Sequence, residues 1–211
     1  MKLYTYFRSS AAYRVRIALA LKGLAYEPGF VHLLRDGGEQ HRPDYGALNP
    51  MHLVPTFVAD DGTVLTQSLA ILEWLEEAYP APALLPRDMT ARARVRAFAA
   101  AIACDIHPLN NLRVLRYLKR ELAQEQVAID TWYRHWIGVA LPALETMAGD
   151  GPFCFGDAPS MADICLVPQL FNARRYGCPL DAFPRLLRAE AACQALPGFQ
   201  AASPGAQPDA E

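Results

Sequence analysis

Three adjacent residues near the start of the chain combine a positive charge with two hydroxyl groups. Arg8, Ser9 and Ser10 follow a short apolar run and precede an uninterrupted stretch of helix formers at 11–22. This order predicts a strand, a tight junction and a helix, with Ser9 or Ser10 as the N-cap. Backbone N–H groups and the positive end of the helix dipole favour an anion at such a junction. The hydroxyls can therefore stabilise a bound anion, although a well-capped first helix would need the same serines.

The junction contains cations but no thiol. Arg14 and Arg16, on the expected helix, are expected to surround the junction with positive charge together with Arg8, whereas the first cysteine is Cys104. The five cysteines include no C-x-x-C pair, so we expect neither a disulfide framework nor a zinc site, and no other metal site. We expect these thiols to be reduced and mostly buried.

The elements that must position the junction are predicted from hydrophobic periodicity and turn residues. Up to Pro80 we expect strands at 3–7, 25–34, 56–59 and 63–66, helices at 11–22 and 68–79, and a polar loop with one short helix at 35–46. Gly23 is expected to end the first helix, and Ser68 is expected to be the N-cap of the second. This order describes a small α/β layer whose last two strands are antiparallel.

The composition changes after Pro80, and no convincing strand follows. Three prolines at 80–86 indicate a semi-rigid linker. Beyond it the periodicity predicts helices at 91–107, 110–122, 127–147, 161–176 and 183–195. Ser160 and Asp163 have the spacing of a capping box. The tail at 201–211 is expected to be frayed or lightly docked.

Size and charge limit the classes of function. The chain has 211 residues, of which 52% are hydrophobic, enough for one substantial core or two small ones. A net charge of -2 argues against nucleic acid or an anionic membrane as the main partner. No apolar stretch reaches spanning length, and the first residues lead directly into a strand. We therefore expect a cytosolic protein without a signal peptide.

The α/β module at 1–80 resembles the thioredoxin fold. Val54-Pro55 lies where that fold keeps a cis proline, and a cis bond there would turn the N–H and C=O of Val54 outward, toward an extended peptide. The redox cysteine of that fold belongs at the first strand-to-helix junction, where this chain has Ser9-Ser10-Ala11-Ala12. Thiol–disulfide oxidoreductase chemistry is therefore nearly excluded.

The whole chain resembles the cytosolic glutathione transferases, with a thioredoxin-like domain at 1–80, a linker at 81–89 and an all-α domain at 90–211. The resemblance is carried by Val54-Pro55, Gln67-Ser68 and the Ser160-x-x-Asp163 capping box, and the zeta class is indicated by Arg8-Ser9-Ser10, Tyr13 to Leu19, Asn49-Pro50, Asp105 to Asn111 and Val167-Pro168-Gln169. One difference stands out, because that class often has Ser-Ser-Cys-Ser at the junction. A mechanism that needs a protein cysteine there is in doubt for this chain.

The resemblance implies that glutathione binds along the α/β module and that the substrate is a small dicarboxylate. The glutathione contacts that it implies are Ser10, His52, Val54, Pro55, Gln67, Ser68 and Asn110, and the catalytic residues are Ser9 and Ser10. The implied substrate contacts are Arg8, Arg113, Arg175 and His107. Arginine suits a carboxylate because its fork binds bidentately, although each arginine could also be a solvated helix charge. His107 could instead satisfy backbone groups near Pro108. A homodimer is implied by the family alone.

The implied activity is the glutathione-dependent cis–trans isomerisation of maleylacetoacetate to fumarylacetoacetate in tyrosine and phenylalanine catabolism, with glutathione transferase side activity. Isomerisation of maleylpyruvate in gentisate degradation is the near alternative. A detoxifying transferase that conjugates electrophiles stays open, although it would not need the arginines. A non-catalytic scaffold with the same fold also stays open, although the intact glutathione residues argue against it.

Overall fold

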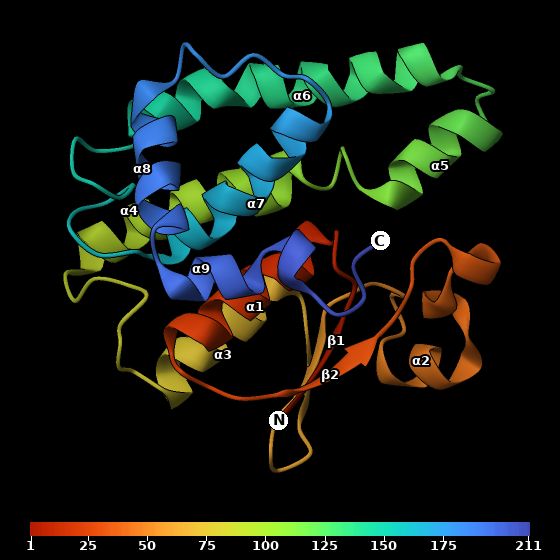
Figure 1. Ribbon diagram of the computed structural model, residues 1–211, viewed down its shortest axis with the longest axis horizontal. Coiled ribbons are helices and arrows are strands. Elements are labelled where there is room, and N and C mark those ends of the chain that lie inside the picture. The colour runs from red at the N-terminus through yellow and green to blue at the C-terminus, as the bar shows by residue number, and fades with distance from the viewer. The chain divides into compact units, whose positions relative to one another are not determined.

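The structure is a computed structural model that describes residues 1–211 (Figure 1). The chain forms two compact units. The first unit comprises Met1–Leu84 and Gln194–Glu211, and the second comprises Leu85–Cys193. The C-terminal residues thus group with the α/β unit, whereas the expected helical domain at 90–211 contained them. The reason is that α9 (Pro197–Ala202) packs against α1 (Ser10–Leu21).

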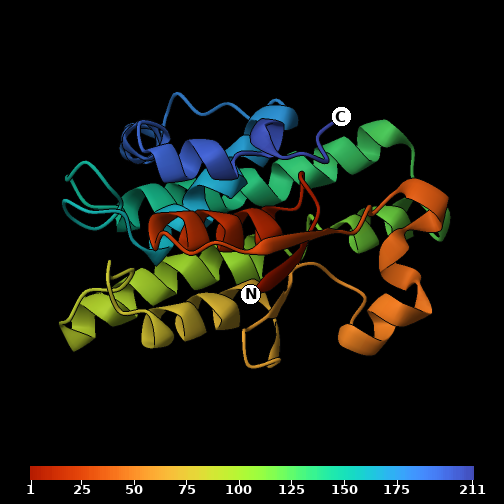
Figure 2. The same cartoon turned by 60° about the horizontal axis from the view of Figure 1, so that its bottom comes forward.

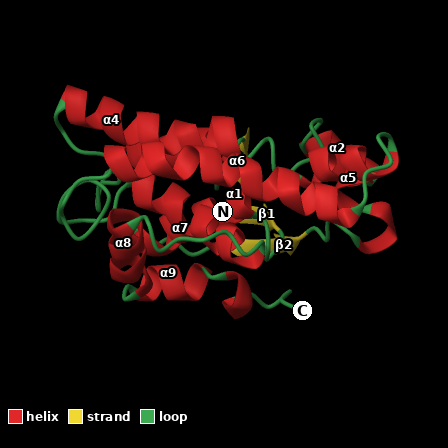
Figure 3. Cartoon of the chain, turned by 90° about the horizontal axis from the view of Figure 1, so that it is seen from above, coloured by secondary structure: helices red, strands yellow, loops and turns green.

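A four-stranded sheet in the order β2-β1-β3-β4 lies in the first unit. Its strands are β1 (Lys2–Thr5), β2 (Glu27–Phe30), β3 (Thr56–Val58) and β4 (Val64–Thr66), drawn in yellow in Figure 3. β2 is parallel to β1, and β3 is antiparallel to both β1 and β4, so the predicted hairpin is confirmed. β1 is shorter than the predicted strand, because the chain turns at Tyr6. There the N–H of Ser9 donates to the Tyr6 carbonyl at 2.9 Å.

Helix α1 contacts both α3 (Ser68–Ala78) and α9 (Figure 2). The core that joins these helices to the sheet consists of fully buried apolar side chains, among them Leu3, Val15, Ile17, Leu19, Phe57, Ile71, Leu72 and Leu75. Burial of one such side chain is worth about 1.5–3 kcal/mol. The short helix expected at 35–46 is α2 (Pro43–Leu48), and Gly23 follows α1 with a φ of +65° as predicted.

The start of α3 differs from the prediction. Gln67, not Ser68, holds the N-cap position, and it does so with a φ of +69° and without a side-chain cap. Ser68 is the first helical residue and is buried. The prediction was wrong because β4 ends at Thr66, which leaves a single residue to make the turn from strand to helix.

The second unit is helical. It contains α4 (Met89–Ala100), a π-helical segment (Ala101–Ile106), α5 (Leu112–Arg120), α6 (Gln126–Met147), α7 (Met161–Arg175) and α8 (Pro184–Gln194). Each predicted helix is present, and the break expected near Pro108 follows the π-helical segment. Helix α4 packs against α7, whose first turn carries the predicted capping box of Ser160 and Asp163.

The C-terminal tail is more ordered than expected. Residues 201–211, predicted to be frayed or lightly docked, include the end of α9 and a 3₁₀ turn at Pro204–Ala206. Across the chain, no helix combines the length and the apolar character needed to cross a membrane.

Candidate active site

The strand register brings three predicted segments of the first unit to one end of the sheet, where the strands begin or finish. Thr56 of β3 pairs with Tyr4 of β1 and with Thr66 of β4. β1 and β4 therefore finish at the same end of the sheet at which the antiparallel strand β3 begins. The predicted residues that this register brings together are Arg8, Ser9, Ser10, Val54, Pro55, Gln67 and Ser68.

The two serines occupy the first positions of α1. Ser9 is the N-cap, and its Oγ accepts a hydrogen bond from the N–H of Ala12 at 3.2 Å. Because Oγ acts here as an acceptor, the Ser9 hydroxyl proton can still be donated to a bound anion. Ser10 begins the helix, is 4% exposed, and has no acidic side chain beside it in the first turn. The positive end of the helix dipole is thus not neutralised locally.

Arg8 is the partly exposed cation of the junction. Its Nη2 donates to the Tyr6 hydroxyl at 2.8 Å, and its guanidinium lies 4.9 Å from the centre of the Phe7 ring. Both contacts restrict the side chain, and the second is a cation–π contact. Nη1 makes no hydrogen bond within the chain, so the fork can still bind a carboxylate. The contribution of Tyr6 was missed, because a tyrosine at the end of an apolar run was counted only as part of the strand.

Arg14 and Arg16 do not line the junction, contrary to the expectation that all three arginines surround it. Both are 1% exposed. Arg14 donates to Ser68 Oγ at 3.2 Å. Arg16 donates to the carbonyls of Phe7 at 2.9 Å and of Ala202 at 3.0 Å. Burial lowers the pKa of Arg16 to about 10, so the group remains charged at neutral pH. These arginines are internal braces, since they fall on the inner face of α1.

The Val54–Pro55 peptide bond is cis, as predicted. The N–H and C=O of Val54 form no hydrogen bond within the chain. The preceding carbonyl, of Leu53, accepts hydrogen bonds from the Tyr45 hydroxyl at 2.6 Å and from Asn49 Nδ2 at 2.7 Å. Two buried side chains thus hold the loop while Val54 keeps a free donor and acceptor, as an extended peptide partner requires.

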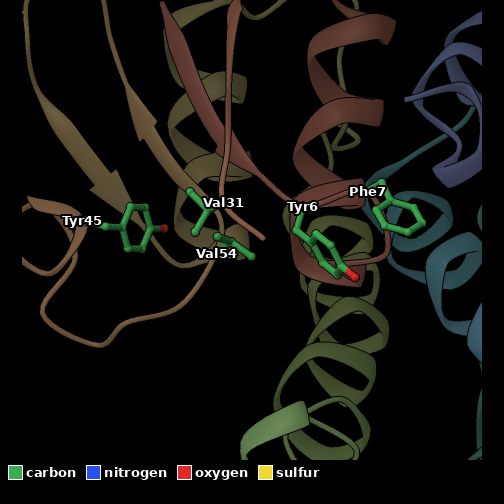
Figure 4. Packing of buried hydrophobic residues seen from close by; sticks show 5 residues of the cluster. All are labelled: Tyr6, Phe7, Val31, Tyr45 and Val54. Carbon is green, nitrogen blue, oxygen red and sulfur yellow. The ribbon is translucent and has the colours of Figure 1, made fainter. Parts of the chain in front are cut away.

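An apolar cluster supports this loop. Figure 4 shows its five buried members, and Val54 and Val31 lie between Tyr45 and the pair Tyr6 and Phe7. Burial raises the pKa of the Tyr45 hydroxyl, which therefore stays neutral and able to donate. Sequence reasoning noted Asn49-Pro50 only as a motif and missed Tyr45 as its partner. The weak helical signal at 35–46 could have indicated that Tyr45 faces inward.

The backbone at Gln67 is in the left-handed region, which a residue other than glycine rarely adopts. Gln67 contributes no cap to α3, so its side chain is not used by its own helix. The first N–H groups of α3 are available to an anion beside Ser68, whose Oγ is held by Arg14. A strained residue beside a helix N-terminus is typical of a ligand-binding turn.

His52 also has a positive φ, of 54°. Its Nδ1 forms a hydrogen bond of 2.9 Å with the Gln40 carbonyl, and its ring packs so closely on Gly46 that a Cβ there would lie 2.7 Å from Cε1. The ring thus fixes the α2 segment to the loop before Val54. A contact with glutathione stays a prediction for this residue.

In the second unit, Asn110 and Arg175 are linked through two stacked aromatic rings. Asn110 Nδ2 lies 3.4 Å from the Tyr133 carbonyl, and its buried Oδ1 has no partner within the chain. The Tyr133 and Tyr176 rings stack with centres 3.5 Å apart. Arg175 lies over the Tyr176 ring and donates to Asn172 Oδ1 at 3.2 Å. Burial raises the pKa of Tyr133, so its ring stays neutral.

The other two predicted substrate residues lie on other segments of the second unit. His107 follows the π-helical segment, and its N–H donates to the Ile102 carbonyl at 2.9 Å. Arg113 is exposed near the start of α5. A separate apolar pocket of about 450 Å³ is lined by Arg94, Ala97, Met147, Gly149 and Phe155. It contains none of the predicted residues.

Comparison with known proteins identifies the family. The family model for the glutathione S-transferase N-terminal domain matches residues 8–78, and the model for the C-terminal domain matches residues 140–191. The chain belongs to the glutathione transferase family. It is 52% identical to the maleylacetoacetate isomerase of Pseudomonas aeruginosa over 99% of this chain and 98% of that protein.

Solved structures of the family agree with this assignment. The holo structure of a maleylpyruvate isomerase, a bacterial zeta-class glutathione transferase, has a TM-score of 0.96 and 46% identity, with both chains covered completely. The maleylacetoacetate isomerase of Methylobacterium extorquens, solved with malonate and glutathione, has a TM-score of 0.95 and 42% identity over the full length of both chains. The predicted fold class, the zeta-class resemblance and the prediction of an isomerase enzyme that uses glutathione are confirmed.

Proposed function

We propose that this glutathione transferase isomerises maleylacetoacetate to fumarylacetoacetate, with maleylpyruvate as the alternative substrate. The observation that carries the proposal is the group of residues at the end of the sheet where β1 and β4 finish and β3 begins. It offers hydroxyls and two helix N-termini for a thiolate and a tripeptide, a free Val54 backbone and a partly exposed arginine, but no protein thiol. Relatives named as isomerases of both substrates support it.

The residues fit glutathione. The free N–H and C=O of Val54 can pair with the backbone of an extended peptide, and the N-terminus of α3 can bind a carboxylate. In the second unit, the unpaired buried oxygen of Asn110 is suited to an N–H donor. The assignments of Ser10, His52, Val54, Pro55, Gln67, Ser68 and Asn110 remain proposals of this kind.

When bound, glutathione would supply a thiolate that adds reversibly to the double bond of a maleyl group. The Ser9 hydroxyl would donate a hydrogen bond to that anion, and the first turn of α1, which begins at Ser10, would place the positive end of the helix dipole beside it. These donors are fixed before the ligand arrives, so they lower the free energy of a charged state without reorganisation.

The arginines would bind and orient the substrate. Arg8 would bind one carboxylate with the part of its fork that Tyr6 does not use. Arg175, held by Asn172 and Tyr176, is equally suited to a carboxylate. Arg113 and His107 are weaker candidates, since Arg113 lacks such support and His107 lies where Pro108 leaves backbone groups to satisfy. Correct orientation of reactants can contribute about 7–11 kcal/mol to catalysis, more than thiol ionisation alone.

We further propose a cytosolic homodimer that acts in tyrosine and phenylalanine catabolism. The support is the resemblance to the zeta class, together with the soluble character expected from charge and hydropathy. Sedimentation equilibrium of the purified chain would test the dimer, and a monomer mass at micromolar concentration would contradict it.

The decisive experiment mixes the purified chain with maleylacetoacetate, and separately with maleylpyruvate, with and without glutathione. We expect the trans isomer to form only when glutathione is present, with glutathione recovered unchanged. Turnover without glutathione would contradict the mechanism. Accumulation of a thioether product would instead favour a conjugating transferase. The ratio of kcat/KM for the two acids decides between the two isomerase activities.

A further inference from the structure

The tail of the chain contacts the β1–α1 junction. Asp209 Oδ2 accepts a hydrogen bond of 2.9 Å from the backbone N–H of Phe7, a residue 202 positions earlier. Phe7 is 5% exposed and lies directly before Arg8 and Ser9. Its N–H has left the sheet, because β1 ends at Thr5. Without Asp209, this buried donor would have no partner, which is costly.

Arg16 holds the carbonyls of the same backbone segment. Its guanidinium donates to the Phe7 carbonyl at 2.9 Å, to the Tyr6 carbonyl at 3.3 Å and to Thr5 Oγ1 at 3.0 Å. Arg16 also donates to the carbonyl of Ala202, the last residue of α9. A buried cation and a carboxylate therefore fix the backbone that precedes the predicted catalytic serines.

The tail is itself anchored on both sides of Asp209. Before it, Gln207 Nε2 donates to the carbonyls of Ala201 at 2.8 Å and Ser203 at 2.9 Å. After it, Glu211 pairs with Arg35 and lies 3.4 Å from His32 Nε2. The contact of Asp209 with Phe7 is thus part of a docked segment and not an isolated approach of a free end.

We propose that Asp209 is a positioning residue for catalysis: through the N–H of Phe7 it holds Arg8, Ser9 and Ser10 in the arrangement that binds the thiolate and the substrate carboxylate. This inference rests on the proposed function. The link to Arg8 runs through Phe7, whose ring lies under the Arg8 guanidinium. The link to Ser9 runs through the turn that its N–H closes with the Tyr6 carbonyl.

Asp209→Ala is expected to lower kcat/KM at least about tenfold, because displacement of catalytic groups by about 1 Å can cost a hundredfold. The matched control is Asp61→Ala. Asp61 accepts a hydrogen bond of the same kind and length from the Thr63 N–H, in the β3–β4 turn of the same sheet. That variant is expected to keep wild-type kcat/KM.

The readouts should separate positioning from stability. Besides kcat/KM, we would measure the midpoint of thermal unfolding and the pKa of bound glutathione from the ultraviolet absorbance of its thiolate. Asp209→Ala is expected to raise that pKa, while Asp209→Asn should recover much of the activity, since its amide oxygen can still accept from Phe7. Equal activity of Asp209→Ala and Asp61→Ala, or no recovery in Asp209→Asn, would overturn the inference.

Asp209→Ala could be too unstable to fold, so a second variant that keeps the carboxylate but displaces it is also needed. Asp209→Glu keeps the charge but moves the oxygens by one methylene, and it is expected to lose activity while remaining folded. Wild-type activity in this variant would overturn the inference. If the wild-type chain failed to bind glutathione, the proposed function would fail by itself. Amide exchange at Phe7 in Asp209→Asn and Asp209→Glu would then still report whether Asp209 holds the junction.

Discussion

The Arg8 guanidinium is partly exposed and restrained by Tyr6 and Phe7, whereas Arg14 and Arg16 are buried within ten residues of it. The three side chains have the same chemistry, so burial alone decides what each can do. A buried guanidinium with carbonyl partners braces the backbone, because its donors are already used. Of the three, only Arg8 is exposed enough to offer part of its fork to a carboxylate.

Arg8→Lys tests this difference. The substitution keeps the charge but removes the planar fork, so we expect the KM for the maleyl acid to rise about tenfold while the Kd for glutathione stays unchanged. Steady-state kinetics and calorimetry measure the two values. Arg185→Lys, at an exposed ion pair with Asp150, is the control and should change neither. A change in glutathione affinity alone would assign Arg8 to the tripeptide instead.

At the scale of elements, side-chain caps fix the start of several helices, whereas the longest helix, α6, has no side-chain cap. Ser9 caps α1, Asp88 caps α4 and Asn111 caps α5 through their side chains. Helix α7 has the full capping box, and Asp163 within it is completely buried. This carboxylate accepts hydrogen bonds of 2.8 Å from the N–H of Cys154, the N–H of Ser160 and the hydroxyl of Ser160.

Asp163→Ala should therefore destabilise the chain far more than the loss of an ordinary cap. Three buried donors would lose their acceptor. At about 1–3 kcal/mol for each unsatisfied group, we expect the free energy of unfolding to fall by at least about 3 kcal/mol. Asp88→Ala removes one exposed capping bond and should cost about 1 kcal/mol. Urea unfolding of both variants measures the difference, and equal losses would refute this account of α7.

At the scale of the whole molecule, burial shapes how the chain responds to pH. Four of the five cysteines are buried, as predicted, and only Cys104 is exposed. Burial, reinforced by nearby Asp163, raises the pKa of the Cys154 and Cys193 thiols far above the usual range. Thiols in the unfolded chain ionise near pH 8.5, so above that pH the unfolded chain binds fewer protons than the folded chain.

Ionisation of these thiols is therefore expected to leave the free energy of unfolding unchanged below about pH 8.5 and to lower it above that pH. Each buried thiol contributes a slope of at most about 1.4 kcal/mol per pH unit. Urea unfolding at neutral and alkaline pH measures this slope. Cys193→Ala should make it smaller, whereas Cys104→Ala, at the exposed position, should leave it unchanged. Identical slopes in the wild-type chain and Cys193→Ala would contradict the linkage.

Much of the fold and of the site could be predicted from the sequence, because the features concerned depend on neighbouring residues. The Ser9 cap, the stop at Gly23, the hairpin and the Ser160-x-x-Asp163 box are set by local backbone and side-chain chemistry. The cis bond before Pro55 was predicted from the resemblance to the thioredoxin fold instead. Hydrophobic periodicity likewise predicted each helix of the second unit. The family resemblance could also be found from the sequence, because its motifs consist of residues that are neighbours along the chain.

Only the tertiary structure decided which polar groups are buried and which distant segments meet. The inward position of Arg16, the turn at Gln67 and the docking of Asp209 on Phe7 could not be predicted, since each depends on segments far apart in the chain. The sequence by itself determined the residues at the junction. Packing of the sheet, α1 and the tail decided their arrangement, because a hydrogen bond requires donor and acceptor to be brought together within a few tenths of an ångström.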